Sequence, residues 1–223
     1  MVERIVCGNV NCYIVGKRGS CSLVDTATEK YFDRICRRAS ELGVKLIVLT
    51  HCHYDHVAGA ARLADALKVP IAVNSADIPF LFNYEYVRME ADTFTGRAML
   101  WMSRRNIKRR IPAFSPSVEL CDKLDLTAFG AEGEAYALPG HTPGSMGVYY
   151  DGALIAGDAV SNIFTACRAK SYYDKEAADA SYRRITEDER ITTIYPGHGR
   201  PIYVKRDRPA MIPVNKSDEK AYL

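Results

Sequence analysis

Residues 51–56 read His-Cys-His-Tyr-Asp-His, and this run constrains the chain more than any other feature. Three imidazoles and a carboxylate are costly to hold this close together unless something binds them. The largely apolar residues 45–50 precede the run, and residues 57–67 after it carry apolar side chains at helical spacing. We therefore expect a buried strand, a loop that displays the cluster, and a helix, an arrangement in which catalytic groups are common.

The other histidines of the chain also follow expected strands. The chain holds five histidines, and His141 and His198 each follow a Pro-Gly pair that ends an apolar, strand-like segment. A further segment of this kind, residues 153–156, ends in Gly157 and Asp158. Imidazole and carboxylate donors without a closed Cys₄ or Cys₂His₂ spacing suit a catalytic metal site better than a structural one.

Taken in order along the chain, these motifs resemble those of the metallo-β-lactamase superfamily of hydrolases. The resemblance also includes residues 11–15 and 23–25, and it runs from about residue 5 to residue 200 with a poorer match near 80–120. It implies an α/β fold, namely a four-layer αββα sandwich of two packed mixed sheets with helices on the outer faces.

The resemblance further implies two metal ions that share a carboxylate. Seven residues would hold them: His51, His53 and His141 on one ion, Asp55, His56 and His198 on the second, and Asp158 between both. These donors suit divalent zinc first, with iron or manganese as alternatives. Asp55 is also the expected catalytic residue, because it could orient a metal-bridging hydroxide or accept its proton. Asp25 is expected to hydrogen-bond the metal loop rather than a metal, and Cys52 to pack in the core.

The function that the resemblance implies is hydrolysis of a thioester or other small-molecule ester by a metal-bridging hydroxide. A glyoxalase-II-like thioesterase leads, although no glutathione-binding segment is recognisable near the carboxyl end. A lactonase is an alternative, but Ser161 stands where a tyrosine would be expected. A phosphodiesterase or ribonuclease and an iron-dependent persulfide dioxygenase also stay open. A flavodiiron protein is disfavoured because His53 stands where that pattern has a glutamate.

Composition limits the setting of the chain. Its 223 residues, 48% of them hydrophobic, can bury a substantial core as one domain. No apolar stretch approaches the ~20 residues that span a bilayer, and we expect no membrane association. Seven cysteines without a signal peptide favour a reduced, cytoplasmic setting. The net charge of +3 is too small to indicate a polyanion, so a small-molecule substrate is expected and nucleic acid is disfavoured.

Residues 76–112 interrupt the alternation of strands and helices and mix aromatic and methionine side chains with basic ones. We expect a helical insertion there, within a single domain at 1–205 that is followed by a loosely ordered tail at 206–223. The insertion could be an ordinary helical layer, a homodimer contact or a lid over the metals. It contains a basic cluster that is either a solvated helix face or a rim for an anionic substrate: Arg104, Arg105, Lys108, Arg109 and Arg110.

Local signals predict several further elements. A helix is expected over residues 28–42, with Gly43 as its stop and with Thr26 and Glu29 at capping-box spacing. Asp151-Gly152 between apolar runs predicts a hairpin turn. A second helix is expected over about 175–187, capped by Asp174.

Overall fold

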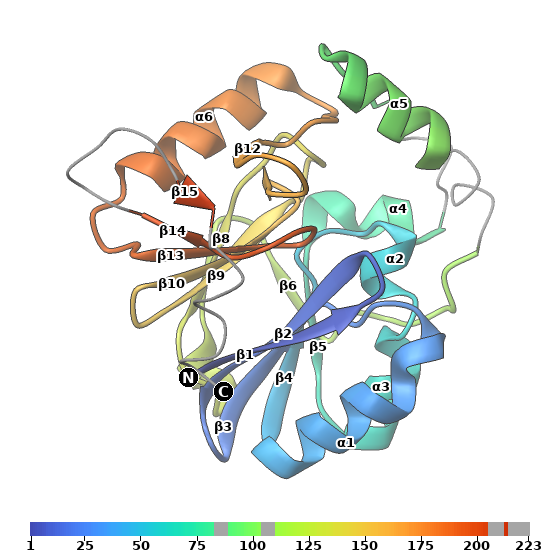
Figure 1. Ribbon diagram of the computed structural model, residues 1–223. Helices are drawn as coiled ribbons and strands as arrows, with labels where there is room; N and C mark the ends of the chain where they lie inside the picture. The colour runs from blue at the N-terminus through green and yellow to red at the C-terminus, as the bar shows by residue number, and fades with distance from the viewer. Residues whose placement is uncertain (83–88, 104–109, 205–211, 214–223) are drawn as a thin grey trace.

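A computed structural model describes residues 1–82, 89–103, 110–204 and 212–213 of the chain (Figure 1). Two β-sheets pack face to face, and helices lie against their outer faces, so the predicted four-layer αββα sandwich is confirmed. Among the described residues, no helix is both long enough and apolar enough to cross a membrane.

The first sheet comes from the amino-terminal half of the chain. Its six strands lie in chain order: β1 (Val2–Cys7), β2 (Val10–Lys17), β3 (Ser20–Val24), β4 (Val44–Val48), β5 (Ile71–Asn74) and β6 (Val118–Leu120). The pairs from β1 to β3 are antiparallel, whereas the pairs from β3 to β6 are parallel. The carboxyl ends of β3, β4 and β5 therefore meet at one edge of the sheet.

The second sheet comes from the carboxyl-terminal half. Its strands lie in the order β15 (Ile212–Pro213), β14 (Ile202–Tyr203), β13 (Thr193–Pro196), β10 (Ala153–Gly157), β9 (Met146–Tyr150), β8 (Glu134–Ala137) and β7 (Lys123–Asp125). Only the β10–β13 pair is parallel among these. The predicted turn between β9 and β10 is confirmed, with positive φ angles of 47° at Asp151 and 80° at Gly152. A separate hairpin joins β11 (Val160–Ser161) to β12 (Cys167–Arg168).

Three apolar clusters hold the layers together. Between the sheets, Leu46 and Val48 of β4 pack with side chains of β9 and β10. On the other face of β4, Ile47 packs with the helices α1 (Phe32–Leu42) and α3 (Ala60–Leu67). The helix α6 (Lys175–Glu187) covers the second sheet through Ile185. Each such buried side chain stabilises the fold by about 1.5–3 kcal/mol, so the alternation along β4 fixes its register.

The predicted helix ends are partly right. Gly43 ends α1 with a φ of 71°, and Asp174 caps α6 by accepting a hydrogen bond from the Ala177 amide. The capping box is wrong, because α1 is entered through a 3₁₀ turn, η1 (Glu29–Tyr31), and Thr28 precedes that turn. The hydroxyl of Thr26 instead donates to the carbonyl oxygen of His56 at 2.9 Å, so a contact distant in sequence takes the place of the local cap.

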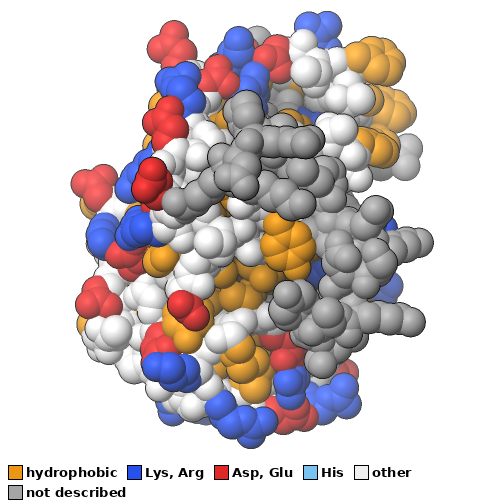
Figure 2. Space-filling model, turned by 60° about the vertical axis from the view of Figure 1, so that its left-hand side comes forward, with side chains coloured by type: hydrophobic (Ala, Val, Ile, Leu, Met, Phe, Trp, Pro, Cys, Tyr) orange, Lys and Arg blue, Asp and Glu red, His pale blue; other side chains and the backbone are white. Residues whose placement is uncertain are grey.

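The described parts of residues 76–112 are helical in two places, α4 (Ile78–Phe82) and α5 (Phe94–Ser103), and a short 3₁₀ helix, η2 (Ser75–Asp77), leads into α4. The limits of the insertion and of the domain stay predictions. In the expected basic cluster, Arg104, Arg105, Lys108 and Arg109 lie outside the described residues, as does most of the expected tail at 206–223. On the described part of the face in Figure 2, basic and acidic side chains are interspersed.

Candidate metal centre

All seven residues predicted from the sequence come together where strands of the two sheets end. Residues 51–56 follow β4, His141 follows β8, Asp158 follows β10 and His198 follows β13. Three groups of these side chains have ligand atoms within 4.8 Å of one another: His51, His53 and His141; His51, His56 and Asp158; and Asp55, His56 and His198. The site is thus built jointly by the two halves of the chain.

The backbone of the 51–56 loop gives its side chains different directions. His51 and His53 lie in the segment before α2 (Tyr54–Val57), and His53 has an extended conformation. Asp55 and His56 lie within α2, so they project from a helical turn. The helix expected over 57–67 therefore begins earlier and is interrupted near Gly59. A Cβ at Gly59 would lie 2.8 Å from the carbonyl oxygen of Thr26, so this close approach requires glycine.

The imidazole nitrogens point at one another across the centre. Nε2 of His141 lies 3.0 Å from Nδ1 of His53, and Nε2 of His56 lies 3.3 Å from Nε2 of His198. The carboxylate of Asp158 lies between these two pairs: its Oδ2 lies 3.7 Å from Nε2 of His141 and 3.3 Å from Nε2 of His198, and its Oδ1 lies 3.6 Å from Nε2 of His56. Asp55 approaches the same side of the centre, with Oδ2 lying 3.5 Å from Nε2 of His198.

Three of the imidazoles are oriented by acceptors outside the centre. Nδ1 of His56 contacts the carboxylate of Asp25 at 2.8 Å. Nδ1 of His141 contacts the Ser171 carbonyl oxygen at 2.8 Å, and Nδ1 of His198 contacts the Asn9 carbonyl oxygen at 2.6 Å. An acceptor at Nδ1 selects the tautomer that carries its proton there, and Nε2 then presents a lone pair inward.

Asp25 supports the loop as the sequence predicted. Its carboxylate accepts hydrogen bonds from the amide and the hydroxyl of Thr50, at 2.8 and 3.0 Å to Oδ1, in addition to the contact with His56. The Thr50 hydroxyl also lies 3.1 Å from Nδ1 of His51. Cys52 is buried in the cluster beneath α1 and α3, so its expected packing role is confirmed.

The pKa is lowered for some of the site histidines and raised for others. Burial lowers the pKa of His51 well below its ordinary range and that of His53 to about 3, so both imidazoles are neutral. Burial acts in the same direction on His56, but the carboxylates of Asp25 and Asp158 outweigh it and raise the pKa of His56 to about 8. Likewise, Asp158 and Asp55 outweigh burial and raise the pKa of His198 to about 10.

The site fits bound metal ions by a test independent of the motif. Nε2 of His51 and Oδ1 of Asp158 are buried and have no hydrogen-bond partner among the described residues. Leaving a buried polar atom unpaired costs about 1–3 kcal/mol, and both atoms are metal-ligand types. A cation between the facing imidazoles would satisfy both atoms and replace the protons on His56 and His198.

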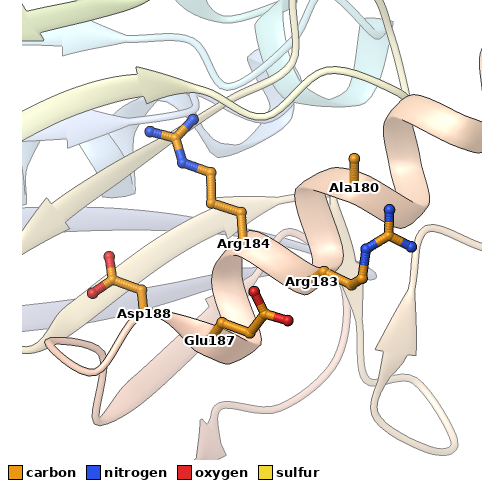
Figure 3. Close-up of a pocket in the computed structure, with 5 residues that line it drawn as sticks. All are labelled: Ala180, Arg183, Arg184, Glu187 and Asp188. Atoms are coloured by element: carbon orange, nitrogen blue, oxygen red, sulfur yellow. The ribbon is translucent and has the colours of Figure 1, made fainter.

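A surface hollow lies away from this centre. A hollow of about 470 Å³ runs along α6 and is lined by five residues: Ala180, Arg183, Arg184, Glu187 and Asp188 (Figure 3). None of these residues belongs to the histidine and aspartate centre, and the Arg184 side chain is engaged with the Ala137 carbonyl oxygen at 3.1 Å. Chemistry, rather than the size of the hollow, identifies the functional site.

Comparison with known proteins defines the class. A family model described as the metallo-beta-lactamase superfamily matches residues 5–198, a range that includes all seven site residues. The chain therefore belongs to the metallo-β-lactamase superfamily, and the resemblance seen in its sequence is confirmed.

Individual proteins are similar to this chain. The probable metallo-hydrolase MJ0888 of Methanocaldococcus jannaschii is 25% identical, over 83% of this chain and 85% of its own length. A hydroxyacylglutathione hydrolase of Vibrio campbellii is 28% identical, but the match covers 63% of this chain and 42% of that protein. A crystal structure of TTHA1623 in a di-iron-bound form has a TM-score of 0.65 and 25% identity, and covers 92% of this chain and 94% of that one.

Proposed function

We propose that this protein is a dinuclear metal-dependent hydrolase that cleaves a thioester or another small-molecule ester. The observation that carries the proposal is the pair of facing imidazole groups on either side of Asp158, together with two buried ligand atoms that have no hydrogen bond among the described residues. His51, His53 and His141 would hold one ion, and Asp55, His56 and His198 the other. When bound, divalent ions supply Lewis-acid polarisation of a carbonyl group and lower the pKa of a coordinated water.

Among the described residues, the site is open to solvent on one side. His51 and His56 are sealed from solvent, with exposed fractions of 1% and 0%, whereas His53, Asp55 and His198 are half-buried. An ester would therefore approach on the side of Asp55. The Asp55 carboxylate, oriented toward His198, can accept the proton that an attacking water loses there.

Similarity favours a thioester as the substrate, and charge favours a small molecule. The hydroxyacylglutathione hydrolase relative carries an activity of that class in its name. The net charge of +3, and the interspersed charges on the described part of the face in Figure 2, favour a small substrate over a polyanion. An iron-dependent persulfide dioxygenase is the second candidate, because the similar fold of TTHA1623 carries iron and this donor set accepts iron as well.

A substrate panel tests the proposal. Zinc-loaded protein is assayed against acyl thioesters, oxygen esters, lactones and phosphodiesters, with Asp158→Asn as the inactive control and Asp65→Asn as the surface control. Asp65 pairs with Lys68 on the exposed side of the molecule, so its substitution should leave turnover unchanged. We expect the highest kcat/KM on a thioester, and turnover of phosphodiesters alone would contradict the proposal. Oxygen uptake with a persulfide by the iron form would favour the second candidate.

A further inference from the structure

A second buried carboxylate, Asp77, has no part in the chemistry described above. It ends η2, directly after β5, and its exposed fraction is 0%. It belongs to none of the three groups of side chains that could hold a metal among the described residues. Burial of a carboxylate is unfavourable unless donors compensate for the lost water, so its partners reveal what it supports.

Three donors converge on Asp77 from the two halves of the chain. Oδ2 accepts hydrogen bonds from the Cys52 amide at 2.9 Å and from the Thr142 hydroxyl at 2.8 Å. Oδ1 accepts a hydrogen bond from the Gly144 amide at 2.6 Å. Cys52 lies between His51 and His53, and Thr142 directly follows His141. One carboxylate therefore ties together the loops that carry these three histidines.

The loop after β8 is shaped to receive this carboxylate. A Cβ at Gly144 would lie 2.7 Å from the Cβ and the Oδ1 of Asp77, so this approach requires glycine. The Thr142 amide donates to the Ser145 hydroxyl at 2.9 Å, and the Thr142 hydroxyl also lies 2.8 Å from it. Since the Thr142 hydroxyl donates its proton to Asp77, it accepts a hydrogen bond from the Ser145 hydroxyl, which in turn accepts one from the Thr142 amide.

Asp77 and Asp25 lie on opposite sides of β4, and both hydrogen-bond the loop that follows it. Because β4 lies between β3 and β5 in the sheet, its loop is held by a carboxylate from each side. Asp25, after β3, contacts Thr50 and His56, whereas Asp77, after β5, contacts the middle of the loop and the loop of His141. Asp25 thus reaches His56 directly and His51 through the Thr50 hydroxyl, whereas Asp77 alone joins the middle of the loop to the loop of His141.

We propose that Asp77 is a positioning residue that holds His51, His53 and His141 in the arrangement that binds one metal ion. This inference rests on the proposed function, because it requires that the site binds metal. It assigns Asp77 to the metal held by His141, whereas Asp25 contacts His56 directly and His51 through Thr50. Partners that orient metal ligands typically change metal affinity by about 10–100-fold when removed.

Asp77→Asn is the matched variant, because it keeps the size of the side chain and removes one acceptor. If its amide nitrogen faces Gly144, a backbone N–H loses its acceptor. If it faces the other way, the Cys52 amide loses its acceptor instead. Thr142→Val removes a single donor and leaves Asp77 in place, so it serves as a milder second variant.

Zn²⁺ titration of the metal-free proteins against a chromophoric chelator tests the proposal, with circular dichroism and thermal unfolding as readouts of folding. We expect Asp77→Asn to weaken one of two zinc-binding events by about 10–100-fold and to leave the other close to wild type. Thr142→Val should act on the same event to a smaller extent, and it keeps the test decisive if Asp77→Asn does not fold. Asp25→Asn should weaken chiefly the other event, because Asp25 contacts His56 directly and His51 only through Thr50, and Asp65→Asn should weaken neither.

Double variants assign the affected event to its site. In a His141→Ala background, which already lacks a ligand of the ion held by His141, Asp77→Asn should weaken zinc binding little further. In a His198→Ala background, it should weaken zinc binding as much as it does in the wild-type protein. Equal weakening of both events, or no change in either, would overturn the positioning role. Failure of the wild-type protein to bind zinc would overturn the proposed function and this inference with it, whereas normal binding by Asp77→Asn would overturn this inference alone.

Discussion

The carbonyl oxygen of Asn9 accepts a hydrogen bond from Nδ1 of His198 at 2.6 Å, although 189 positions separate the two residues. The turn between β1 and β2 thereby orients the last histidine of the site. The side-chain amide of Asn11 strengthens the same junction, donating to the carbonyl oxygens of Pro196 at 3.1 Å and Gly199 at 2.9 Å. The first hairpin of the chain is therefore part of the construction of the metal centre.

Substitution of Asn11 by alanine should loosen this junction. The carbonyl oxygens of Pro196 and Gly199 would each lose one donor and keep another, the Tyr13 hydroxyl at 2.7 Å and the Arg4 guanidinium at 3.5 Å. The expected cost is therefore that of a net hydrogen bond, about 0.5–1.5 kcal/mol for each one lost. We expect a lower thermal midpoint in the metal-free protein and weaker binding of zinc at the ion held by His198. An unchanged zinc affinity with a lowered midpoint would show that the hairpin stabilises the fold without orienting the histidine.

Asp158→Asn should remove most of the activity. The variant keeps the shape of the side chain but loses the negative charge that lies between the facing imidazoles. Since outer partners of metal ligands alone change activity by about 10–100-fold, loss of a shared ligand should reduce kcat by at least about 100-fold. Steady-state kinetics at saturating zinc checks this outcome. Retention of full turnover would rule out a shared carboxylate in the reaction.

The metal-free protein should be most stable near the ordinary pKa of histidine, which is about 6.5. Protonation of His56 and His198 is favoured in the folded state, so their contribution is present below that pH and is lost as pH rises through about 8 and about 10. His53 has a pKa lowered to about 3, so folding is opposed as pH falls from the ordinary value toward about 3. Thermal unfolding across the pH range measures this profile, and stability that rises steadily from neutral to alkaline pH would contradict it.

The apolar side chains of α5 offer a test of the insertion. Phe94 and Trp101 have exposed fractions of 86% and 69%, whereas Phe80 of α4 is buried. Trp101→Ala should therefore change stability by less than about 0.5 kcal/mol, while Phe80→Ala should cost about 3–5 kcal/mol. A changed KM in Trp101→Ala would favour a lid, and a changed sedimentation coefficient would favour a dimer contact. A large loss of stability in Trp101→Ala would show that the helix packs as core.

Much of the fold and of the centre could be predicted because the signals are local. His141, Asp158 and His198 each follow an apolar strand, and the structure places them at strand ends. Thr26 shows the opposite case, since its local capping signal was outweighed by the His56 carbonyl oxygen, a partner that only the tertiary fold brings near.

The supporting contacts were harder to predict. The acceptors of His141 and His198 are main-chain carbonyl oxygens of Ser171 and Asn9, and every residue type offers such an oxygen, so no sequence pattern marks them. Asp77 carries a detectable signal, a carboxylate just after a strand parallel to β4, but recognising it requires knowing that β5 pairs with β4.

Metal content per chain tests the central claim most directly. Elemental analysis is made on protein purified without a chelator or a metal-binding tag, and is repeated on Asp158→Asn. We predict about two divalent ions per chain in the wild-type protein, with zinc predominant, and a clear loss in the variant. A single iron ion per chain, or a metal content that the Asp158 substitution does not change, would contradict the dinuclear hydrolase.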